Sequence, residues 1–491
     1  MATTLALTAI TVAVALALLL RAPAAKAGAM GIALLGTPVI LIGEIWDSGA
    51  MERLRDRPLV LLVLLAVGLA VVVAGSMLVR RRPGWLPLVV AAVLPFRIPI
   101  DVGDAQPVNL LLPLYVVIGA AALAWVWDRI REESAREVSD PRPVAAEVAL
   151  LLVVVLYAVQ SEWSIDQGKA IEQIAFFYMP FAMLYVVLRS VAWTTVLATR
   201  ALVVSAAVAL GLAAIGFYEY ATRTVLLNPK IIASNQIEDT FRVNSLFFDP
   251  NIYGRFLALV MLGLAAWLLW SRASRIVAIL GVVLVVLWAA LVITYSQTSF
   301  VALLGGLAIL GGLRWGPWRA LGVAAVALVI GMTVTLATSP DLDDATSGRV
   351  ELIGGGIGVF ADHPVKGAGS GAFERAYREA QRTGNRDAVA ASHTIPVTIA
   401  AEQGLIGLAA YLALIVLLIR RLIRAAETSA ARAGVAAMTV ALIVHTLGYA
   451  SFLEDPALWV LIAVGMGLSG AGRPRPTSRR ERPAAPAAPA A

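Results

Sequence analysis

The sequence predicts an all-α fold, a polytopic membrane helix bundle with a large, partly helical extracytoplasmic loop. Of the 491 residues, 60% are hydrophobic and only 14% are charged. Soluble proteins are about half apolar and about a quarter charged, so this chain carries more apolar surface than a water-soluble fold can bury. Apolar runs long enough to cross a bilayer also recur along the chain, separated by short charged segments. Together these observations predict about 12–15 transmembrane helices.

Each predicted span is an apolar run bounded by charged or turn-forming residues. The spans lie near residues 5–20, 29–45, 58–79, 86–100, 109–127, 146–160, 171–188, 201–220, 251–270, 276–293, 298–313, 319–337, 393–419, 433–450 and 456–470. The second and fourth are short and contain proline, which interrupts helices, so the count is a range. The first run is followed, not preceded, by Arg21 and Lys26, which favours a membrane helix. The segment APAAKAGA after it nevertheless resembles a signal-peptide cleavage site.

Basic residues predict the orientation of the bundle. They cluster in loops separated by even numbers of spans, so all the clusters can face the cytoplasm together. These clusters are Arg80–Arg82, Arg272 with Arg275, Arg314 with Arg319, Arg420–Arg432 and Arg473–Arg482. The net charge of +7 is explained by this role and does not indicate nucleic acid. The absence of cysteine excludes disulfides and thiolate chemistry.

The domain organisation follows from the same pattern. We predict one transmembrane domain over residues 1–470 and a disordered cytoplasmic tail at 471–491, where Pro and Ala alternate. Two predicted outer loops, at about 221–250 and 338–392, are far longer than a connection requires. Loops longer than about 15 residues in compact proteins are usually functional or disordered. Helix-forming patterns inside these two loops favour a functional role.

The first outer loop ends in DTFRVNSLFFDPNIYGRFLAL. Asp249, Pro250 and Asn251 suit a helix start, because Asp and Asn cap backbone amides and Pro is tolerated in the first turn. Arg242 lies nine residues before Asn251 in a polar segment. It is either solvated or bound to a lipid phosphate, or it is a ligand for a diphosphate, which the planar fork of arginine donors suits.

The second outer loop contains Arg349 at the start of a helical stretch and glycines at 367, 369 and 371. No strand precedes the glycines, so a nucleotide-binding loop is excluded by context. They are expected to form tight turns or to let the backbone approach a partner closely. Three acidic residues of this loop are compatible with a divalent cation, but a helix cap is favoured and no metal site is expected. They are Asp341, Asp343 and Asp344.

Residues 373–382 form an amphipathic pattern. Four apolar residues share one helical face, namely Phe373, Ala376, Tyr377 and Ala380. Three arginines recur at spacings of three and four, namely Arg375, Arg378 and Arg382. This pattern is typical of a helix on the membrane surface, and a solvated basic face is equally consistent with it.

The stretch SHTIPVTIAAEQGLIGLAAYL opens with His393, one of three histidines, at the mouth of an apolar helix. His393 is either a structural cap or a general base, since its ordinary pKa lies near working pH. At 100° per residue it shares a mostly small face with Gly404 and Tyr411, whereas Glu402 points elsewhere and cannot form a dyad with it. Glu402 is expected to be a buried helix-to-helix hydrogen bonder. His445 lies in an apolar span and is expected to be a packing residue.

Four segments in this order resemble the O-antigen ligase and polymerase family of bacterial envelope glycosyltransferases. They are Arg242 with DPNIYGRFLAL, then TYSQTSFVALL, then SGRVELIGGGIGVFADHPVKGAGSGAF, then SHTIPVTIAAEQGLIGLAAYL. The resemblance spans roughly 242–412. It implies an enzyme that transfers a glycan from an undecaprenyl-diphosphate carrier to an acceptor hydroxyl outside the cytoplasmic membrane, without metal or cofactor.

The resemblance also implies roles for particular residues. It assigns diphosphate binding to Arg242 and Arg349, and acceptor activation to His393. Many relatives have Ser-Arg where this chain has Ser296-Gln297, so other cations, such as Arg255 or Lys366, would have to neutralise the donor. The candidates for a supporting role are Asn251, Arg255, Gln297, Lys366 and Glu402.

Two other classes of function remain as alternatives, a transporter or flippase of lipid-linked saccharides and a non-catalytic envelope-assembly protein. Transporters usually carry ionisable groups near the bilayer midplane and internal repeats. Here the span centres are nearly free of charge, and the polar candidates lie in the outer loops. The expected partners are the lipid-linked glycan, an acceptor glycolipid, glycan or protein, and membrane lipids. The sequence does not separate a ligase from a polymerase.

Overall fold

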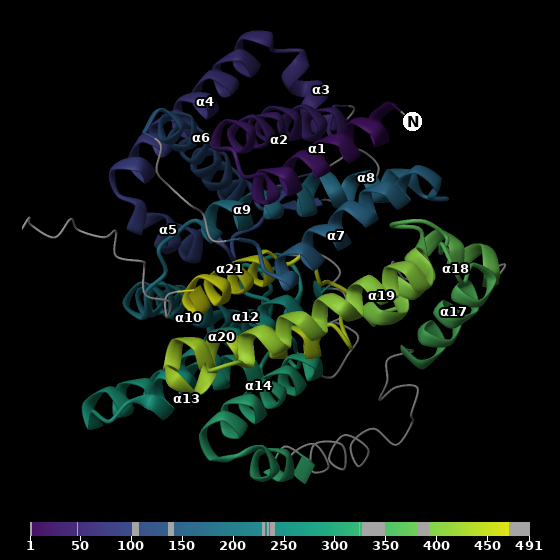
Figure 1. Cartoon of the computed structure of the whole chain (residues 1–491). Helices are drawn as coiled ribbons and strands as arrows, with labels where there is room; N and C mark the ends of the chain where they lie inside the picture. Colours follow the sequence, from purple (N-terminus) through teal and green to yellow (C-terminus); the bar gives the residue numbers. More distant parts are fainter. Residues whose placement is uncertain are drawn as a thin grey trace, which may run out of the picture.

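The computed structural model of the chain describes residues 2–46, 48–100, 108–135, 142–227, 231–232, 235, 241–323, 325–326, 349–381 and 392–470. These residues form a bundle of long helices that run roughly side by side (Figure 1). The α-helices are α1 (Ala2–Leu19), α2 (Pro23–Glu44), α3 (Gly49–Arg55), α4 (Pro58–Arg81), α5 (Leu86–Val93), α6 (Leu112–Ala135), α7 (Ala145–Gln160), α8 (Gln167–Gln173), α9 (Met179–Arg189), α10 (Thr195–Thr222), α12 (Pro250–Trp270), α13 (Ser274–Val292), α14 (Gln297–Trp315), α17 (Arg349–Asp362), α18 (Phe373–Gln381), α19 (Ile395–Ile423), α20 (Ala430–His445) and α21 (Pro456–Gly470). Short 3₁₀ or π segments lie at Pro83–Trp85, Ser161–Trp163, Ile174–Tyr178 and Ala426–Thr428.

The predicted fold class is confirmed. Within the described ranges, ten helices are long and apolar enough to cross a membrane, and α1, α5, α20 and α21 are shorter apolar helices in the same bundle. The helices coincide with the apolar runs because a chain in hydrocarbon must satisfy its backbone groups within each segment. Most of the predicted span at 319–337 lies outside the described residues. The predicted tail at 471–491 and the aspartates at 341, 343 and 344 lie entirely outside them.

The predicted span at 86–100 is wrong in its second half. Helix α5 ends at Val93, and the chain then forms strand β1 (Ile98–Ile100), which pairs antiparallel with β2 (Val108–Leu110). Proline has no N–H to donate and disfavours a helical conformation in the residue before it, so Pro95 and Pro99 prevent the helix from continuing. Arg97, which the sequence placed inside a span, therefore lies in the connection after it.

The bundle has two chemically different ends. At one end, α12, α14, α19 and α21 begin and α7, α13 and α20 end; we call it the site end. At the other end, α12, α14 and α19 finish and α20 begins; we call it the basic end. There the indole of Trp270 donates to the carbonyl of Glu427 at 3.0 Å, and the guanidinium of Arg314 lies 5.9 Å from the centre of the Trp270 ring.

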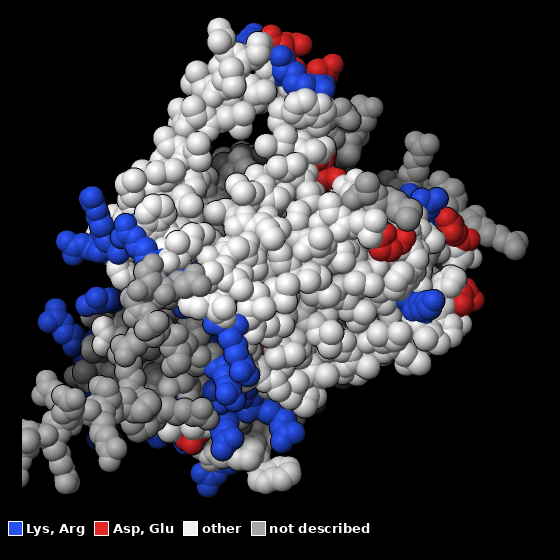
Figure 2. All heavy atoms as spheres, turned by 45° about the horizontal axis from the view of Figure 1, so that its top comes forward, with Lys and Arg blue, Asp and Glu red and all other residues white. Residues whose placement is uncertain are grey.

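Lysine and arginine side chains gather along the left of the molecule in Figure 2, around the basic end, whereas a broad face beside them carries neither basic nor acidic groups. Arg80 and Asp128, at the ends of α4 and α6, form an ion pair of 2.7 Å on that side. The pattern agrees with helices that place their basic ends together on one side of a membrane.

Helices α17 and α18 form an outer layer beside the start of α19 (Figure 1). Of the four apolar residues predicted to share a face, Phe373, Ala376 and Tyr377 are buried against the protein, whereas Ala380 is exposed. Phe373, Ala376 and Tyr377 pack in one cluster with Leu352 and Val359 of α17. This small second core fixes the outer layer to the bundle, because fully burying a large apolar side chain contributes about 1.5–3 kcal/mol.

Candidate active site

Five side chains from three helices meet at the site end and form what we call the polar cluster: Asn251, Ser296, Thr298, Ser299 and His445. The Ser296 hydroxyl lies 2.8 Å from both the Asn251 Oδ1 and the Ser299 Oγ. The His445 Nε2 lies 3.3 Å from the hydroxyls of Thr298 and Ser299. All except Asn251 are buried. A buried hydrogen-bonded network of this kind fixes the relative positions of α12, α14 and α20.

Local sequence explains why these groups meet. Ser296 is the N-cap of α14, and its hydroxyl accepts the backbone N–H of Ser299. His445 is the last residue of α20, where the helix dipole favours a positive charge. The sequence placed His445 inside a span that extended to 450 and assigned it to packing. Helix α20 in fact ends at His445, and the imidazole is fully buried, as a packing residue would be, but it also lies within hydrogen-bond distance of two hydroxyl groups.

Arg242 lies beside the polar cluster. Its Nε donates to the carbonyl of Thr294 at 3.2 Å, two residues before Ser296. Its backbone exchanges two hydrogen bonds with the Asn235 side chain, at 3.0 and 2.9 Å. The next residue, Val243, donates its N–H to the carbonyl of Ile293 at 3.3 Å. The turn between α13 and α14 therefore holds the Arg242 guanidinium at the edge of the cluster.

His393 is held on the other flank of the cluster. Thr394 Oγ1 donates to the carbonyl of Leu447 at 3.0 Å, and the N–H of Ile395 donates to the carbonyl of Thr446 at 3.0 Å. These carbonyls belong to the two residues that directly follow His445. The structure thus brings the segments of Arg242, Asn251, His445 and His393 to one region.

The backbone of His393 corrects its predicted place on a helix face. Helix α19 begins at Ile395, and His393 has a φ of 58°, in the left-handed region. Two residues of the neighbouring loops, Ser245 and Tyr295, also have a left-handed backbone, each with a φ of 51°. A non-glycine residue in such a conformation costs about 1–3 kcal/mol and persists only where surrounding contacts impose it. Strain of this kind is typical of functional sites.

Arg255 belongs to a second polar group, which lies next to the polar cluster. It is only 2% exposed, and its Nη2 lies 2.7 Å from the Asp455 Oδ2. The half-buried Arg97 interacts with the same carboxylate, and Arg97, Arg255 and Asp455 line one small cavity. We call Arg97 and Arg255 the arginine pair. Tyr449 connects the two groups, because its ring lies 5.7 Å from the His445 ring centre and 5.7 Å from the Arg255 guanidinium carbon.

Burial, and after it the neighbouring charges, shift two pKa values in this second group. Burial lowers the pKa of Arg97, with Asp455 opposing the shift and Arg255 adding to it. Burial also raises the pKa of Tyr449 well above its ordinary range, and the neighbouring Asp249 raises it further. The Tyr449 hydroxyl donates to the Asp249 Oδ2 at 3.0 Å. Tyr449 is therefore a neutral donor, and Arg97 stays cationic because arginine keeps its proton in proteins.

Glu402 joins the outer layer to α19. Its Oε2 accepts the N–H of Gly371 at 3.0 Å, and its Oε1 accepts the N–H of Phe373, the first residue of α18, at 3.2 Å. The predicted buried hydrogen-bonding role is thus confirmed, although the donors are backbone amides of the glycine turn and of a helix start. Glu402 positions the loop layer that begins at Arg349.

The glycine turn itself docks into a break in α19, and we call this contact the glycine clamp. Ala368 and Gly369 donate to the carbonyls of Ala401 and Glu402 at 3.0 and 2.8 Å, and Gly404 breaks the helix with a φ of 64°. A Cβ on Gly369 would lie 2.1 Å from the Cα of Ser164. The prediction that these glycines permit close backbone approach is confirmed.

The other predicted residues have different positions. Gln297 is exposed as the first residue of α14, beside the polar cluster. Lys366 is exposed on the glycine clamp, with its Nζ 6.0 Å from the Trp163 ring centre. Arg349 is the first residue of α17, and its side chain lies outside the described atoms. Among the described residues, no group of three His, Asp or Glu side chains could hold a metal ion.

An acidic cavity of about 580 Å³ lies between α7, the start of α19 and the loop before α21. Tyr157, Tyr178, Thr398, Glu402 and Glu454 line it. The Tyr178 hydroxyl donates to the Glu454 Oε1 at 2.9 Å, and burial raises the pKa of Glu454. Carboxyl, amide and phenol groups of this kind can exchange hydrogen bonds with hydroxyl-bearing ligands.

The residues that sequence reasoning missed had only weak signals, and they are Arg97, Tyr449, Glu454 and Asp455. Each lies in a short segment at the end of an apolar run. Polar residues at membrane depth usually face the bundle interior, and that rule was the available signal.

Comparison with protein families identifies an O-antigen ligase model that matches residues 280–412. The match covers about a quarter of the chain and contains Ser296, the glycine clamp, Glu402 and His393. Arg242, Asn251, Arg255 and His445 lie outside it. Comparison with curated proteins gave no match.

Proposed function

We propose, from the assignment of this chain to the O-antigen ligase and polymerase family, that it transfers a glycan from a polyprenyl-diphosphate carrier to an acceptor hydroxyl on the outer face of the cytoplasmic membrane. The family match and the apolar helices indicate a bacterial membrane protein with O-antigen-ligase-like transfer activity in general. One observation carries the finer proposal. Arg242 and the His393 segment are attached to opposite flanks of the same polar cluster.

The basic end supports the orientation that this reaction needs. Short loops rich in arginine stay in the cytoplasm, so the opposite, site end faces outward. Nucleotide sugars are absent outside, and a transferase there requires a lipid-carried donor. The C-terminal residues after α21 then start on the cytoplasmic side, because α21 begins at the site end.

In the proposed reaction the acceptor oxygen attacks the anomeric carbon of the donor sugar. The bond between that carbon and the diphosphate oxygen breaks, and its electron pair stays on the diphosphate. His393 takes the proton of the attacking hydroxyl. General-base assistance of this kind contributes about 10²–10⁴ in rate. The strained backbone at His393, with hydrogen-bonded anchors at the next two residues, supports this role, since such strain is typical of functional sites.

Arg242 and Arg349 neutralise the charge that develops on the leaving diphosphate. Positive groups fixed in advance at a developing anion are a large term in catalysis, and the arginine fork binds two oxygens at once. Arg242 is prepared for this role, because one N–H already bonds the Thr294 carbonyl and fixes the guanidinium. Fixed guanidinium groups can perform this neutralisation without a metal.

Gln297 is uncharged where many relatives have arginine, so another cation would have to supply this positive charge. Of the two replacements considered, Arg255 is the better one, because Tyr449 connects it with the polar cluster. Lys366 lies over Trp163 on the glycine clamp instead. The acidic cavity beside the start of α19 provides acceptors for the hydroxyl groups of an incoming saccharide.

The test is transfer from a purified polyprenyl-diphosphate glycan by detergent-solubilised protein. We expect His393→Ala to lower the transfer rate by at least about 10²-fold, as for loss of a general base. Arg242→Ala and Arg349→Ala should also lower it strongly, with less effect on protein stability than on rate.

His363→Ala is the matched control. His363 is an exposed histidine that directly follows α17, and it is not part of the polar cluster. It should retain the wild-type rate. Full activity in all three site variants would refute the assignment of these residues. Transport of the lipid without glycan transfer by wild-type protein would instead favour a flippase.

A further inference from the structure

The acidic cavity borders the segment of His393. Ile395 and Thr398 line it, and they lie two and five residues after His393. The Thr398 hydroxyl lies 2.9 Å from the Ser392 Oγ, and the N–H of Ile395 donates to the carbonyl of Thr446. One wall of the cavity is therefore continuous with the segment that carries the proposed general base.

Polar side chains form about half of the walls of the acidic cavity. They are two tyrosines, two glutamines, two glutamates and a threonine, and none of the described lining residues is a lysine, arginine or histidine. Pockets for small ligands combine apolar and aromatic walls with a few fixed polar groups, and this cavity has that composition.

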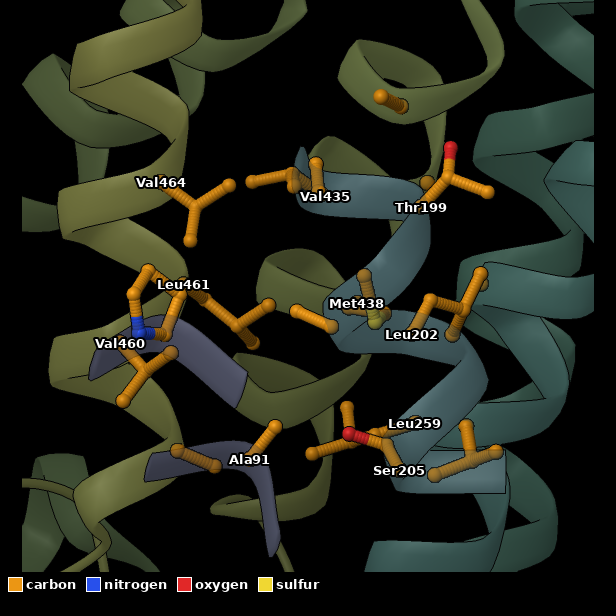
Figure 3. A pocket seen from close by; sticks show the side chains of 18 of the residues that line it. Ala91, Thr199, Leu202, Ser205, Leu259, Val435, Met438, Val460, Leu461 and Val464 are labelled. Atoms are coloured by element: carbon orange, nitrogen blue, oxygen red, sulfur yellow. The ribbon is translucent and has the colours of Figure 1, made fainter. Parts of the chain in front are cut away.

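A larger cavity of the bundle has the opposite chemistry. Figure 3 shows this apolar groove between α5, α10, α12, α20 and α21, with Leu202, Leu259, Val435 and Leu461 facing the space. Burying a hydroxyl group without a hydrogen bond is unfavourable, so a saccharide is not stable between such walls. A hydroxyl-bearing ligand fits the acidic cavity instead.

The charge around the acidic cavity is negative. The carboxyls of Glu402 and Glu454 line it. The cation whose charge acts on both is Lys169, but its Nζ already lies 2.9 Å from the Glu172 Oε1. Burial raises the pKa of Glu454. An anionic ligand would be buried here without a cation, which is unfavourable whether the glutamates are ionised or protonated.

The cavity also contains hydrogen-bonding groups that the protein does not use. Gln403 is only 3% exposed, and within the described ranges its side-chain amide makes no hydrogen bond. Buried polar groups are normally paired, so this amide indicates a ligand. Glu402 and Glu454 each accept two bonds from the protein, whereas a carboxylate has about four acceptor positions. The hydroxyl groups of a sugar could donate to the remaining positions.

A π-helical turn directs Tyr178 to the acidic cavity. The turn Ile174–Tyr178 lies between α8 and α9, and such turns are frequent at functional sites. The ring of Tyr157 packs edge-on against Tyr178 with their centres 4.7 Å apart, and its hydroxyl donates to the Gln173 side chain. Both phenol oxygens act as donors within the protein and can still accept a hydrogen bond from a ligand.

We propose that the acidic cavity binds the terminal sugar of the acceptor and selects a neutral or amino-bearing sugar over one that carries a carboxylate. The inference rests on the proposed function for the role of this sugar as acceptor. The position supports that role, because the cavity borders the His393 segment, whereas Arg242 lies on the opposite flank of the polar cluster. An ammonium group can pair with the glutamates and a hydroxyl can donate to them, but a carboxylate meets no cation.

Binding of simple glycosides tests the cavity without the lipid-linked donor. The probes are the methyl glycosides of glucose, glucosamine and glucuronic acid. They are titrated into full-length protein at neutral pH, in a detergent without a sugar head group, and binding is followed by NMR. We expect the wild type to bind the glucuronide at least about ten-fold more weakly than the glucoside, because juxtaposed like charges disfavour binding. It should bind the glucosaminide at least as tightly as the glucoside.

Two variants assign this selectivity to the cavity. Glu454→Gln keeps the shape of the side chain but removes the carboxyl. It should weaken binding of the glucosaminide several-fold, reduce the discrimination against the glucuronide and change binding of the glucoside little. Gln403→Met removes the free amide and should weaken binding of all three probes. Glu427→Gln is the matched control, since Glu427 is exposed at the basic end, and it should bind the probes normally.

Equal binding of the glucoside and the glucuronide by wild type would overturn the proposal, and this comparison does not depend on the folding of a variant. So would the absence of binding by all three probes, or unchanged binding in both Glu454→Gln and Gln403→Met. His393→Ala separates the two proposals. If it binds the glucoside normally and still transfers glycan, the catalytic assignment fails while the cavity assignment stands. If wild type transfers glycan equally fast to acceptors that end in glucose and in glucuronic acid, the selectivity fails while the transfer function stands.

Discussion

Arginines at the two ends of the bundle have the same chemistry but different surroundings. At the basic end, Arg314 is exposed and stacks on Trp270, and the Arg80–Asp128 pair is 27% and 50% exposed. At the site end, Arg255 and Asp455 are only 2% and 7% exposed. Exposed ion pairs contribute about 0–1 kcal/mol, whereas removing one partner of a buried pair costs about 3–5 kcal/mol. The first set can orient the chain, whereas the second is part of the buried structure at the site end.

The largest predicted effect tests this contrast between buried and exposed arginines directly. Arg255→Met removes the guanidinium that lies 2.7 Å from the buried Asp455 carboxylate, so only Arg97 remains near it, and should lower the free energy of unfolding by up to about 3–5 kcal/mol. Arg314→Met at the basic end should change it by no more than about 0.5 kcal/mol. Thermal or denaturant unfolding of both variants in the same detergent measures the difference.

The double variant Arg255→Met/Asp455→Leu gives the control. It removes both charges of the pair, and replacing a buried pair by apolar groups is often neutral, so part of the stability should return, while Arg97 is left without the Asp455 carboxylate. A single variant Arg255→Met as stable as wild type would show that the pair is not desolvated, and the contrast between the two ends would disappear.

The fold was predictable because the bilayer imposes one length and one composition on every span. The site was predictable only in part. His393 and Arg242 could be proposed as site residues because each lies in a polar segment of a predicted outer loop. The hydroxyl partners of His445 could not be predicted, because an average over an apolar run cannot show that α20 ends at residue 445.

The arginine pair illustrates the second limit. Arg97 and Arg255 are 158 positions apart, since 255 − 97 = 158, and Asp455 is a further 200 positions along the chain. Hydropathy describes each segment alone and carries no information on which ends meet across the bundle. The family match did not supply it either, because all three residues lie outside 280–412.

A second, smaller effect sharpens the contrast in the backbone. Gly369 in the glycine clamp and Gly316 at the basic end both have a φ of 103°. A Cβ on Gly369 would lie 2.1 Å from the Cα of Ser164, whereas a Cβ on Gly316 meets nothing within 4 Å. Both alanine variants carry the strain of a φ of 103°, so the difference between them reports mainly the packing clash.

We expect Gly369→Ala to be less stable than Gly316→Ala by about 1–3 kcal/mol, the usual cost of overpacking. It should also release the outer layer, because the bonds of the clamp to Ala401 and Glu402 cannot form at the present distance. Protease cleavage within 364–381 and the glycan transfer rate measure this. Equal cleavage in the two variants would mean that the clamp does not hold the layer.

The smallest predicted effect concerns the pH dependence of stability at the site end. Burial raises the pKa of Glu454, whose oxygens accept hydrogen bonds from the Tyr178 hydroxyl and the Phe452 N–H, both at 2.9 Å. Between the ordinary glutamate pKa of about 4.3 and the raised value, the folded protein binds a proton that the unfolded chain releases. The free energy of unfolding contributed by this group is therefore highest below that window and falls as pH rises through it.

Glu454→Gln is neutral at every pH and should flatten this part of the curve, with a gain in stability at neutral pH that is smaller than either effect above. Unfolding curves collected across the window, for wild type and variant in one detergent, measure it, and parallel curves would show that Glu454 is hydrated in the folded protein.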